Sequence, residues 1–372
     1  MARVAQAAAT KPGQSGDKLR SLRASVEKDG AGTLGDIYLN RPSIGTNSPY
    51  PPDLSVGSWS GGRVRGMLKS LLIGLSESRS LRRFAERSAL GRRIAHRFAA
   101  GIDIADALEA ARRVNAAGAS ATIDNLGENA ATADEARVSA DLYHGLLDAI
   151  EGGDLQANIS LKLSQVGLDL NTSLYQELVE ALVQHAALIG NFVRIDMEGS
   201  RYTQRTLDLV QRLHQMPENA SYVGAVIQAS LRRSEADVDK LLRERIRIRL
   251  CKGAYKERAH VAFPDKGSVD ENFVGLAKKL LRSGVFHGIA THDDRLIETL
   301  KQYVRTEGIE RESFEFQMLY GVRPQLQQQL VRAGWRLRIY IPFGTAWYPY
   351  FIRRLAERPA NLVFAAKSIC RR

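Results

Sequence analysis

The stretch Phe192–Glu198 reads FVRIDME and shows the pattern that organises most of the chain. Apolar and charged residues alternate along it, which is the two-residue period of a β-strand. The apolar set, which we expect to face helices, is Val193, Ile195 and Met197. The opposite set is Arg194, Asp196 and Glu198. Burying a charge is costly unless it has a partner. The strand is therefore expected to have one apolar face and one face whose charged groups pair with other polar groups or with a ligand.

The same kind of strand recurs along the chain, each time followed by a helical segment. Eight strand–helix units in succession predict an α/β fold, a distorted (β/α)8 TIM-like barrel with extra N-terminal helices. An open doubly wound sheet is the alternative, and the lack of a Gly-rich phosphate turn after the first strand argues against it. The predicted strands are Ala121–Leu126, Asn158–Ser164, Phe192–Glu198, Val223–Ala229, Ile246–Lys252, His287–His292, Phe314–Leu319 and Leu337–Ile341. The predicted helices between them are Thr132–Ile150, Ser173–Ile189, Gln204–Gln215, Ser234–Arg243, Asp270–Ser283, Arg295–Thr306 and Pro324–Ala333.

Three regions follow from composition. Residues 1–66 are rich in Gly, Ser, Pro, Asn and Ala, and we expect a disordered or loosely attached extension there. Residues 67–118 carry apolar residues at helical spacing, including a helix over Ile102–Ala117, and are expected to form N-terminal helices. Residues 119–372 are expected to form the barrel as the catalytic domain.

Polar residues in the inward phase of the strands mark a candidate pocket. In a parallel barrel the carboxyl ends of the strands meet at one mouth, where barrel enzymes keep their sites. We therefore expect convergence of Lys162, Asp196, Gln228, Arg249, Gln317 and Tyr340. A strand-end lysine, Lys162 or Lys252, is also compatible with a Schiff-base nucleophile. No metal site is indicated, because His292 lacks a ligand-type neighbour at the usual spacing.

The stretch Arg338–Glu357 reads RIYIPFGTAWYPYFIRRLAE. It begins as a strand, which Pro342 and Gly344 are expected to break, and a short helix follows. Residues three and four apart share a helix face, so Tyr350, Arg353, Arg354 and Glu357 are expected on one side. Two adjacent arginines can clamp a carboxylate through forked, charge-assisted hydrogen bonds. A solvated helix face is the other interpretation.

Composition bounds the class of protein. The 372 residues are 44% hydrophobic, carry a net charge of +12 and include two cysteines, which fits a reducing cytosol rather than a disulfide scaffold. No apolar run reaches the roughly 18–20 residues that cross a bilayer, and no secretory signal is evident. Ten Lys and Arg against two Asp and Glu fall between Arg63 and Arg97. A solvated basic face is the first interpretation and peripheral membrane contact the second. No nucleic-acid-binding motif accompanies the segment, so we expect no nucleic-acid partner.

Seven motifs, in order along the chain, resemble those of the proline dehydrogenases, particularly the stand-alone bacterial enzymes. The resemblance covers roughly residues 67–370. The motifs are SLKLS around Lys162, RIDME around Asp196, VIQA around Gln228, RLCKGAY at Arg249–Tyr255, ATHD at Ala290–Asp293, FQMLYG at Phe316–Gly321 and YPYFIRR at Tyr348–Arg354. Residues 1–66 have no recognised counterpart, and the further domains of the bifunctional relatives are absent from the sequence.

The resemblance implies a distorted (β/α)8 barrel that binds FAD, oxidises L-proline to Δ1-pyrroline-5-carboxylate and passes electrons to a membrane quinone. It implies an enzyme that is cytoplasmic and peripheral at the inner face of the membrane, with product passing to a separate pyrroline-5-carboxylate dehydrogenase. The catalytic residues would be Asp196 and Arg249. The substrate-binding residues would be Lys162, Tyr255, Leu319, Tyr340, Tyr350, Arg353 and Arg354. The FAD-binding residues would be Met197, Gln228, Arg249, Lys252, Gly253, Ala254, Thr291, His292, Gln317 and Glu357.

Two other classes compete with this interpretation. An aldolase-like barrel using Lys162 or Lys252 predicts a colourless protein that borohydride traps with a carbonyl substrate. A basic binding protein predicts salt-dependent retention on nucleic acid and no chromophore.

Overall fold

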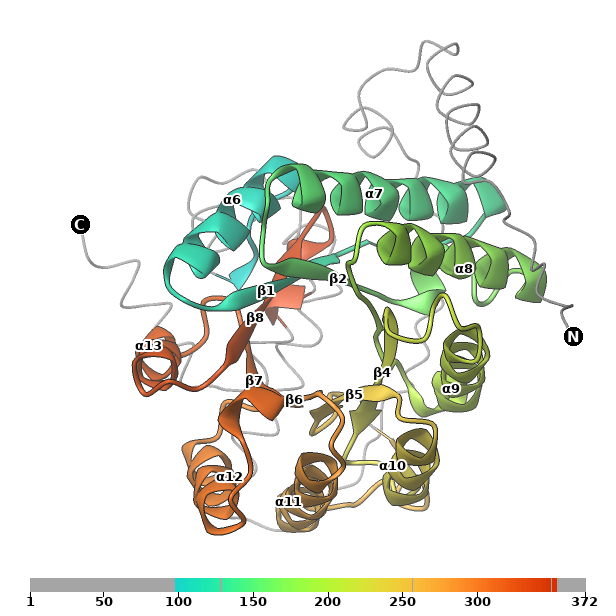
Figure 1. Cartoon of the computed structure of the whole chain (residues 1–372). Helices are drawn as coiled ribbons and strands as arrows, with labels where there is room; N and C mark the ends of the chain where they lie inside the picture. Colours follow the sequence, from blue (N-terminus) through green and yellow to red (C-terminus); the bar gives the residue numbers. More distant parts are fainter. Residues whose placement is uncertain (1–97, 128, 256, 349, 353–372) are drawn as a thin grey trace, which may run out of the picture. The chain divides into compact units, whose positions relative to one another are not determined.

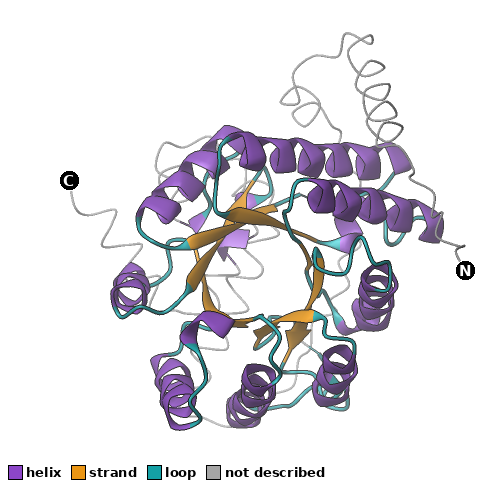
Figure 2. Cartoon of the chain, viewed as in Figure 1, coloured by secondary structure: helices purple, strands orange, loops and turns teal. Residues whose placement is uncertain are grey.

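The computed structural model describes residues 98–127, 129–255, 257–348 and 350–352. Its eight strands form a closed barrel in the order β1 to β8, so the predicted barrel is confirmed and the open sheet is wrong. Figure 2 shows the strands as a ring with helices around the outside. All neighbouring strands are parallel, and β1 closes the ring by pairing with β8 from Ser120 and Arg338 to Asn125 and Phe343.

The strands are β1 (Ser120–Asn125), β2 (Ala157–Leu161), β3 (Val193–Ile195), β4 (Val223–Gln228), β5 (Arg247–Cys251), β6 (His287–Ala290), β7 (Phe314–Leu319) and β8 (Leu337–Phe343). The α-helices are α6 (Ile104–Ala116), α7 (Ala133–Gly152), α8 (Thr172–Leu188), α9 (Ser200–His214), α10 (Ser234–Arg243), α11 (Lys266–Arg282), α12 (Asp294–Thr306) and α13 (Pro324–Arg332). Two short 3-10 helices, η1 (Leu163–Val166) and η2 (Arg311–Ser313), also occur in the described residues. Figure 1 labels the helices α6 to α13 and most of the strands.

The layer between strands and helices is the main hydrophobic core. Ile159, Ile195 and Ile248 are completely buried there, as their alternation predicts. Burying a side chain of this size contributes about 1.5–3 kcal/mol. This layer fixes which strand residues face the helices, and it therefore forces the alternate residues into the barrel.

Helix starts follow side-chain capping. The Thr132 hydroxyl accepts a hydrogen bond from the Glu135 N–H at the start of α7. Two helices begin four residues earlier than predicted. In α9, the Glu257 carboxylate accepts from the Ser200 N–H at 2.7 Å, a contact from a distant loop that local sequence does not reveal. In α11, the Asp265 side chain caps the Ser268 N–H.

Pro342 does not break the last strand, which corrects the sequence-based expectation. β8 continues to Phe343, and Pro342 pairs in register with Asp124 of β1. A proline lacks an N–H, so it is tolerated where no neighbour needs that donor. On the β7 side the pairing ends at Leu319 and Tyr340, and the Pro342 carbonyl there accepts from the Ala100 N–H at 2.8 Å. The proline therefore costs the sheet no hydrogen bond.

Several expectations lie outside the described residues. They are the extension at residues 1–66, the helices of residues 67–97 with their basic surface, and the positions Arg353, Arg354 and Glu357. Residues 347, 348 and 350–352 are helical, so the expected helix near the end of the chain is present at Tyr350. In the described part, no helix has the length and apolarity required to cross a membrane.

His287, at the start of β6, is held as a neutral imidazole. Its Nδ1 accepts from the Ile248 N–H at 3.0 Å, so the proton sits on Nε2, which faces the Ser283 hydroxyl at 2.9 Å. Burial lowers the pKa of His287 to about 3, and the nearby cations Arg194 and Arg247 act in the same direction.

We expect this histidine to make the fold acid-sensitive. The unfolded chain binds a proton at His287 below pH ~6.5, whereas the folded chain does so only near pH 3, so the free energy of unfolding falls as pH falls between these values. His287→Asn keeps an acceptor for Ile248 without the titration. Urea-unfolding midpoints at pH 7 and pH 4.5 should show a smaller loss on acidification in the variant. The exposed His260→Asn is the control, and equal losses in both variants would contradict the assignment.

Candidate active site

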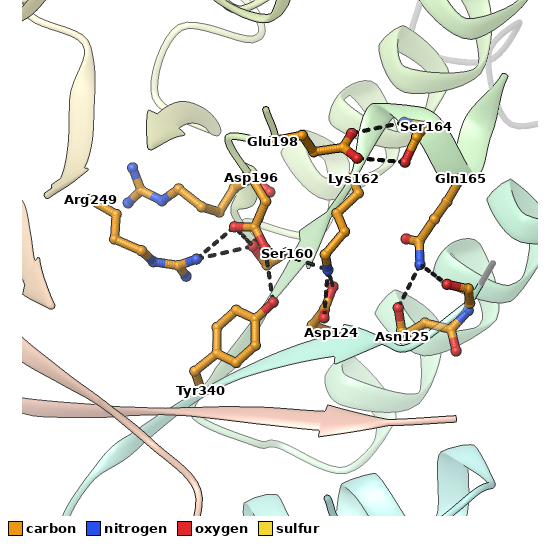
Figure 3. Close-up of polar contacts among 12 residues, drawn as sticks. Asp124, Asn125, Ser160, Lys162, Ser164, Gln165, Asp196, Glu198, Arg249 and Tyr340 are labelled. Atoms are coloured by element: carbon orange, nitrogen blue, oxygen red, sulfur yellow. Dashed lines mark hydrogen bonds and ion pairs between the residues drawn. The ribbon is translucent and has the colours of Figure 1, made fainter. Parts of the chain in front are cut away.

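Asp196, directly after β3, is the centre of a polar network at the carboxyl-end mouth of the barrel (Figure 3). Its Oδ1 accepts from the Ser160 hydroxyl at 2.6 Å and from Arg249 Nη1 at 2.8 Å. Its Oδ2 accepts from the Tyr340 hydroxyl at 2.8 Å. Strands β2, β5 and β8 each supply one of these partners, so a carboxylate from a fourth strand end ties them together.

A second carboxylate shares the network through a lysine. Lys162 Nζ lies 2.8 Å from Asp124 Oδ2 and 3.8 Å from Asp196 Oδ2, and Figure 3 shows its ammonium group between the two acids. Asp124 lies in β1 and is completely buried. Two carboxylates and the two cations Lys162 and Arg249 therefore alternate around the mouth.

The electrostatics of the site follow from burial and from these pairings. Burial alone would raise the pKa of Asp196, but Arg249 and Lys162 bring it below its usual range. Burial raises the pKa of Asp124, and Lys162 only partly offsets this. Burial would lower the pKa of Lys162, but Asp124 and Asp196 raise it above its ordinary value. A Schiff-base lysine requires the opposite shift, so the aldolase-like alternative is disfavoured at Lys162.

Arg249 is held from its other side by β7. Its Nε donates to Gln317 Oε1 at 2.6 Å, and its guanidinium carbon lies 5.2 Å from the centre of the Tyr340 ring. The Gln317 amide in turn donates to Glu315 Oε1 at 2.7 Å. One nitrogen, Nη2, is buried and has no hydrogen-bond partner among the described residues. The arginine is thus rigid and keeps one donor for a bound molecule.

Gln228 lies beside the network rather than in it, which differs from the expected convergence. Its Nε2 donates to the main-chain oxygen of Glu198 at 2.9 Å. The Glu198 carboxylate accepts from the N–H and the hydroxyl of Ser164, which anchors the turn after β2. The other five residues that were expected to converge form one network. Lys162, Arg249 and Tyr340 contact Asp196 directly, and Gln317 is linked to it through Arg249.

The loop after β5 carries four predicted site residues, and Gly253, Ala254 and Tyr255 are exposed in it. Lys252 forms ion pairs with Asp270 and Asp293, so this ammonium is also not a free amine nucleophile. The φ of Gly253 is +103°, and a Cβ there would lie 2.2 Å from Ser230 Oγ. Glycine is therefore required by both conformation and space.

The remaining predicted residues follow strand ends, except for Tyr350, which lies in the helix after β8. His292 Nε2 accepts from the Leu319 N–H at 2.8 Å, which fits the expected hydrogen-bonding role. Met197, Thr291 and Tyr350 are buried, at 6%, 5% and 8% exposure. No described group of three or more His, Cys, Asp or Glu side chains has the arrangement of a metal site.

Sequence reasoning missed two buried acids. Asp124 and Glu315 are 0% and 3% exposed, and both contact residues that had been singled out. The sequence does contain a signal for both. Asp124 lies two residues after Thr122 and Glu315 two residues before Gln317, and residues two apart on a strand face the same side. Both acids belong to the barrel-facing residues of β1 and β7.

Comparisons with known proteins agree with this architecture. Residues 107–367, more than half of the chain, match the family model described as "Proline dehydrogenase". Proline dehydrogenase 1 of Bacillus subtilis (strain 168) is 42% identical over 82% of this chain and 100% of its own length. The proline dehydrogenase of Deinococcus radiodurans is 37% identical over 74% of this chain and 90% of its own.

A solved structure shows the same fold. Proline utilization A (PutA) from Bdellovibrio bacteriovorus, inactivated by N-propargylglycine, superimposes with a TM-score of 0.70 at 23% identity. The match covers 79% of this chain and 36% of that longer protein. Because the family match spans most of the barrel and these two relatives are covered over 100% and 90% of their own lengths, this chain belongs to the proline dehydrogenase family, a family of oxidoreductases that act on CH–NH donors.

Proposed function

We propose that this chain oxidises L-proline to Δ1-pyrroline-5-carboxylate, with FAD as cofactor and a membrane quinone as electron acceptor. The observation that best supports this is the rigid charged network around Asp196, in a member of the proline dehydrogenase family. It lies at the mouth where barrel enzymes bind their substrates.

The residues of the mouth suit a flavin. The family is flavin-dependent in general. Arg249 offers a buried donor that has no partner among the described residues, and the backbone of the loop at Gly253 and Ala254 is exposed beside it in sequence. The residues proposed to hold FAD are Met197, Gln228, Arg249, Lys252, Gly253, Ala254, Thr291, His292, Gln317 and Glu357. Bound FAD supplies the acceptor for the hydride.

The chain's own residues orient the substrate and exclude water. Arg353 and Arg354 are proposed to hold the proline carboxylate, with the Lys162 ammonium beside them. The proposed walls around the ring are Tyr255, Leu319, Tyr340 and Tyr350. Fixing the carboxylate aims the opposite side of the ring at the acceptor, and such positioning supplies much of the rate enhancement when little acid–base chemistry is needed. Asp196 keeps Arg249 and Tyr340 in place.

The test is the visible absorption spectrum of the purified protein before and after anaerobic addition of L-proline. We expect a flavin spectrum that bleaches with proline. A yellow protein whose flavin spectrum does not change on addition of proline would contradict proline as the substrate. A colourless protein that FAD does not reconstitute would refute the cofactor and with it the proposed reaction.

Quinone as acceptor implies contact with a membrane surface, at which the enzyme would be cytoplasmic and peripheral. The basic segment Arg63–Arg97, outside the described residues, is the proposed contact. We expect flotation with anionic liposomes at low salt and release at high salt, and no flotation at low salt would contradict the contact. The product would pass to a separate pyrroline-5-carboxylate dehydrogenase.

Replacement of either proposed clamp residue should weaken substrate binding. We expect Arg353→Ala or Arg354→Ala to raise the KM for proline by about 10–100-fold, because a charge-assisted bond is worth about 1.5–3 kcal/mol. Flavin content should stay the same. Steady-state kinetics with matched flavin loading measure this, and an unchanged KM in both variants would contradict the clamp.

Gly288 of β6 is expected to control the position of Arg249. A Cβ at Gly288 would lie 2.2 Å from Gln317 Nε2, so Gly288→Ala must displace the amide that holds Arg249. We expect flavin reduction by proline to slow by about tenfold, or ~1.4 kcal/mol in the barrier. Gly275→Ala in α11 is the control, because its added Cβ meets no atom within 4 Å. Equal rates in both variants would remove the positional role of Gln317.

A further inference from the structure

A polar pocket lies at the amino-terminal end of the barrel, opposite the Asp196 network. It is an open pocket of about 560 Å³ in front of the first residues of β4, β5, β6 and β8. Four arginines line it: Arg245, Arg247, Arg336 and Arg338. His214 and Ser221 add polar groups, and no acidic side chain contributes to the lining.

The arginines of this pocket are short of negative partners. Arg338 pairs with Glu315 at 2.6 Å. Arg245, Arg247 and Arg336 form no ion pair with any described carboxylate, and the Nε of Arg247 is buried with no hydrogen-bond partner in the described part of the chain. Burial lowers the pKa of Arg247; the Glu315 carboxylate opposes this, and Arg338 and Arg336 lower the pKa further. The pocket therefore holds excess positive charge.

The guanidinium groups are also held in place. Arg247 lies between two rings, 4.2 Å from the centre of Phe192 and 5.0 Å from that of Phe286. Arg336 lies 4.9 Å from the same Phe286 ring. A planar cation fixed on an aromatic face loses less side-chain freedom when it binds an anion. These arginines are thus arranged before any ligand arrives.

Arg245 occupies a conformation that an arginine rarely adopts. Its φ is +58°, in the left-handed region that glycine enters without cost. Its Nη2 donates to the Gly284 carbonyl at 3.3 Å, which brings the side chain to the pocket. Arg245 directly follows the C-cap of α10, where helices commonly end in a left-handed residue, so its conformation belongs to the helix end.

We propose that this pocket binds a multiply charged anion of the phosphate class, a polyphosphate or phosphate ester. Arginine forks match phosphate oxygens in pairs, and several forks around one cavity favour two or more phosphoryl groups over a single carboxylate. The site is separate from the proposed proline and flavin positions, which lie at the other mouth.

Isothermal titration of the flavin-loaded, full-length protein with inorganic pyrophosphate at low salt tests this, because bound flavin keeps its own phosphate region filled. The variant is Arg245→Gln with Arg336→Gln, two exposed residues outside the proposed catalytic machinery. We expect the double variant to weaken binding by at least about tenfold, or ~1.4 kcal/mol. Arg112→Gln on α6, an exposed arginine that does not line this pocket, should bind as the unmodified chain does. No binding at 10 mM pyrophosphate, or equal binding by all three proteins, would overturn the site.

Discussion

Asp196→Ala is expected to lower kcat/KM for proline by about 10²–10³-fold, the usual effect of removing a preorganised electrostatic group. Its carboxylate accepts three hydrogen bonds from Ser160, Arg249 and Tyr340. Without it Arg249 loses its nearest anion, 2.8 Å away, and the Tyr340 hydroxyl loses its acceptor. Both side chains are proposed to face the reacting molecules, so the loss should appear in the rate of flavin reduction.

A graded series separates charge from shape. Asp196→Asn retains an oxygen for Arg249 but no negative charge, so its rate should fall between those of the unmodified chain and Asp196→Ala. Asp208→Asn, on the exposed face of α9, is the control. Single-turnover reduction by proline, at matched flavin content, is the measurement. If Asp196→Ala reduced its flavin as fast as the control, the central role of Asp196 would be lost.

The fold was predictable because the two periodicities of the chain are strong. On each strand, every second residue is apolar, and this set identifies the side that faces the helices. Ile159, Ile195 and Ile248 are buried on that side. The polar residues of the other phase must then enter the barrel. Lys162, Asp196 and Arg249 were found in this way, without any knowledge of their contacts.

The pairings themselves were not predictable, because they join strands far apart in the sequence. Asp124 meets Lys162 across 38 residues, and Gln317 meets Arg249 across 68. The same applies to Glu257, whose carboxylate extends α9 by binding the Ser200 N–H. Such contacts form only when the barrel is closed, so the local sequence around each residue does not indicate them.

The position of Pro342 illustrates a different limit. A proline after five alternating residues normally ends a strand. Here the neighbouring strand β7 has already ended, so the missing N–H faces no acceptor. Whether a proline breaks a strand depends on the length of its neighbours, which the sequence of one strand does not contain.

Glu315→Ala is expected to have the largest effect on stability, lowering the free energy of unfolding by about 3–5 kcal/mol. This carboxylate is 3% exposed and accepts from Arg338 Nε at 2.6 Å and from Gln317 Nε2 at 2.7 Å. Burial would raise the pKa of Glu315, but Arg338 holds it below the usual range, so the group is ionised. Glu315 is the negative charge that faces Arg338 and Arg194 inside the barrel. Its removal leaves these two arginines without that negative charge.

The double variant Glu315→Leu with Arg338→Met decides whether charge is the cause. If the loss arises from an unpaired buried arginine, removing both charges should restore most of the stability, because a buried ion pair is often no better than apolar residues of similar volume. Glu109→Gln, which breaks an exposed pair with Arg113, should cost no more than about 1 kcal/mol. Urea-unfolding midpoints measure all three. A double variant as unstable as Glu315→Ala would mean that the Gln317 hydrogen bond and packing, rather than charge, make Glu315 necessary.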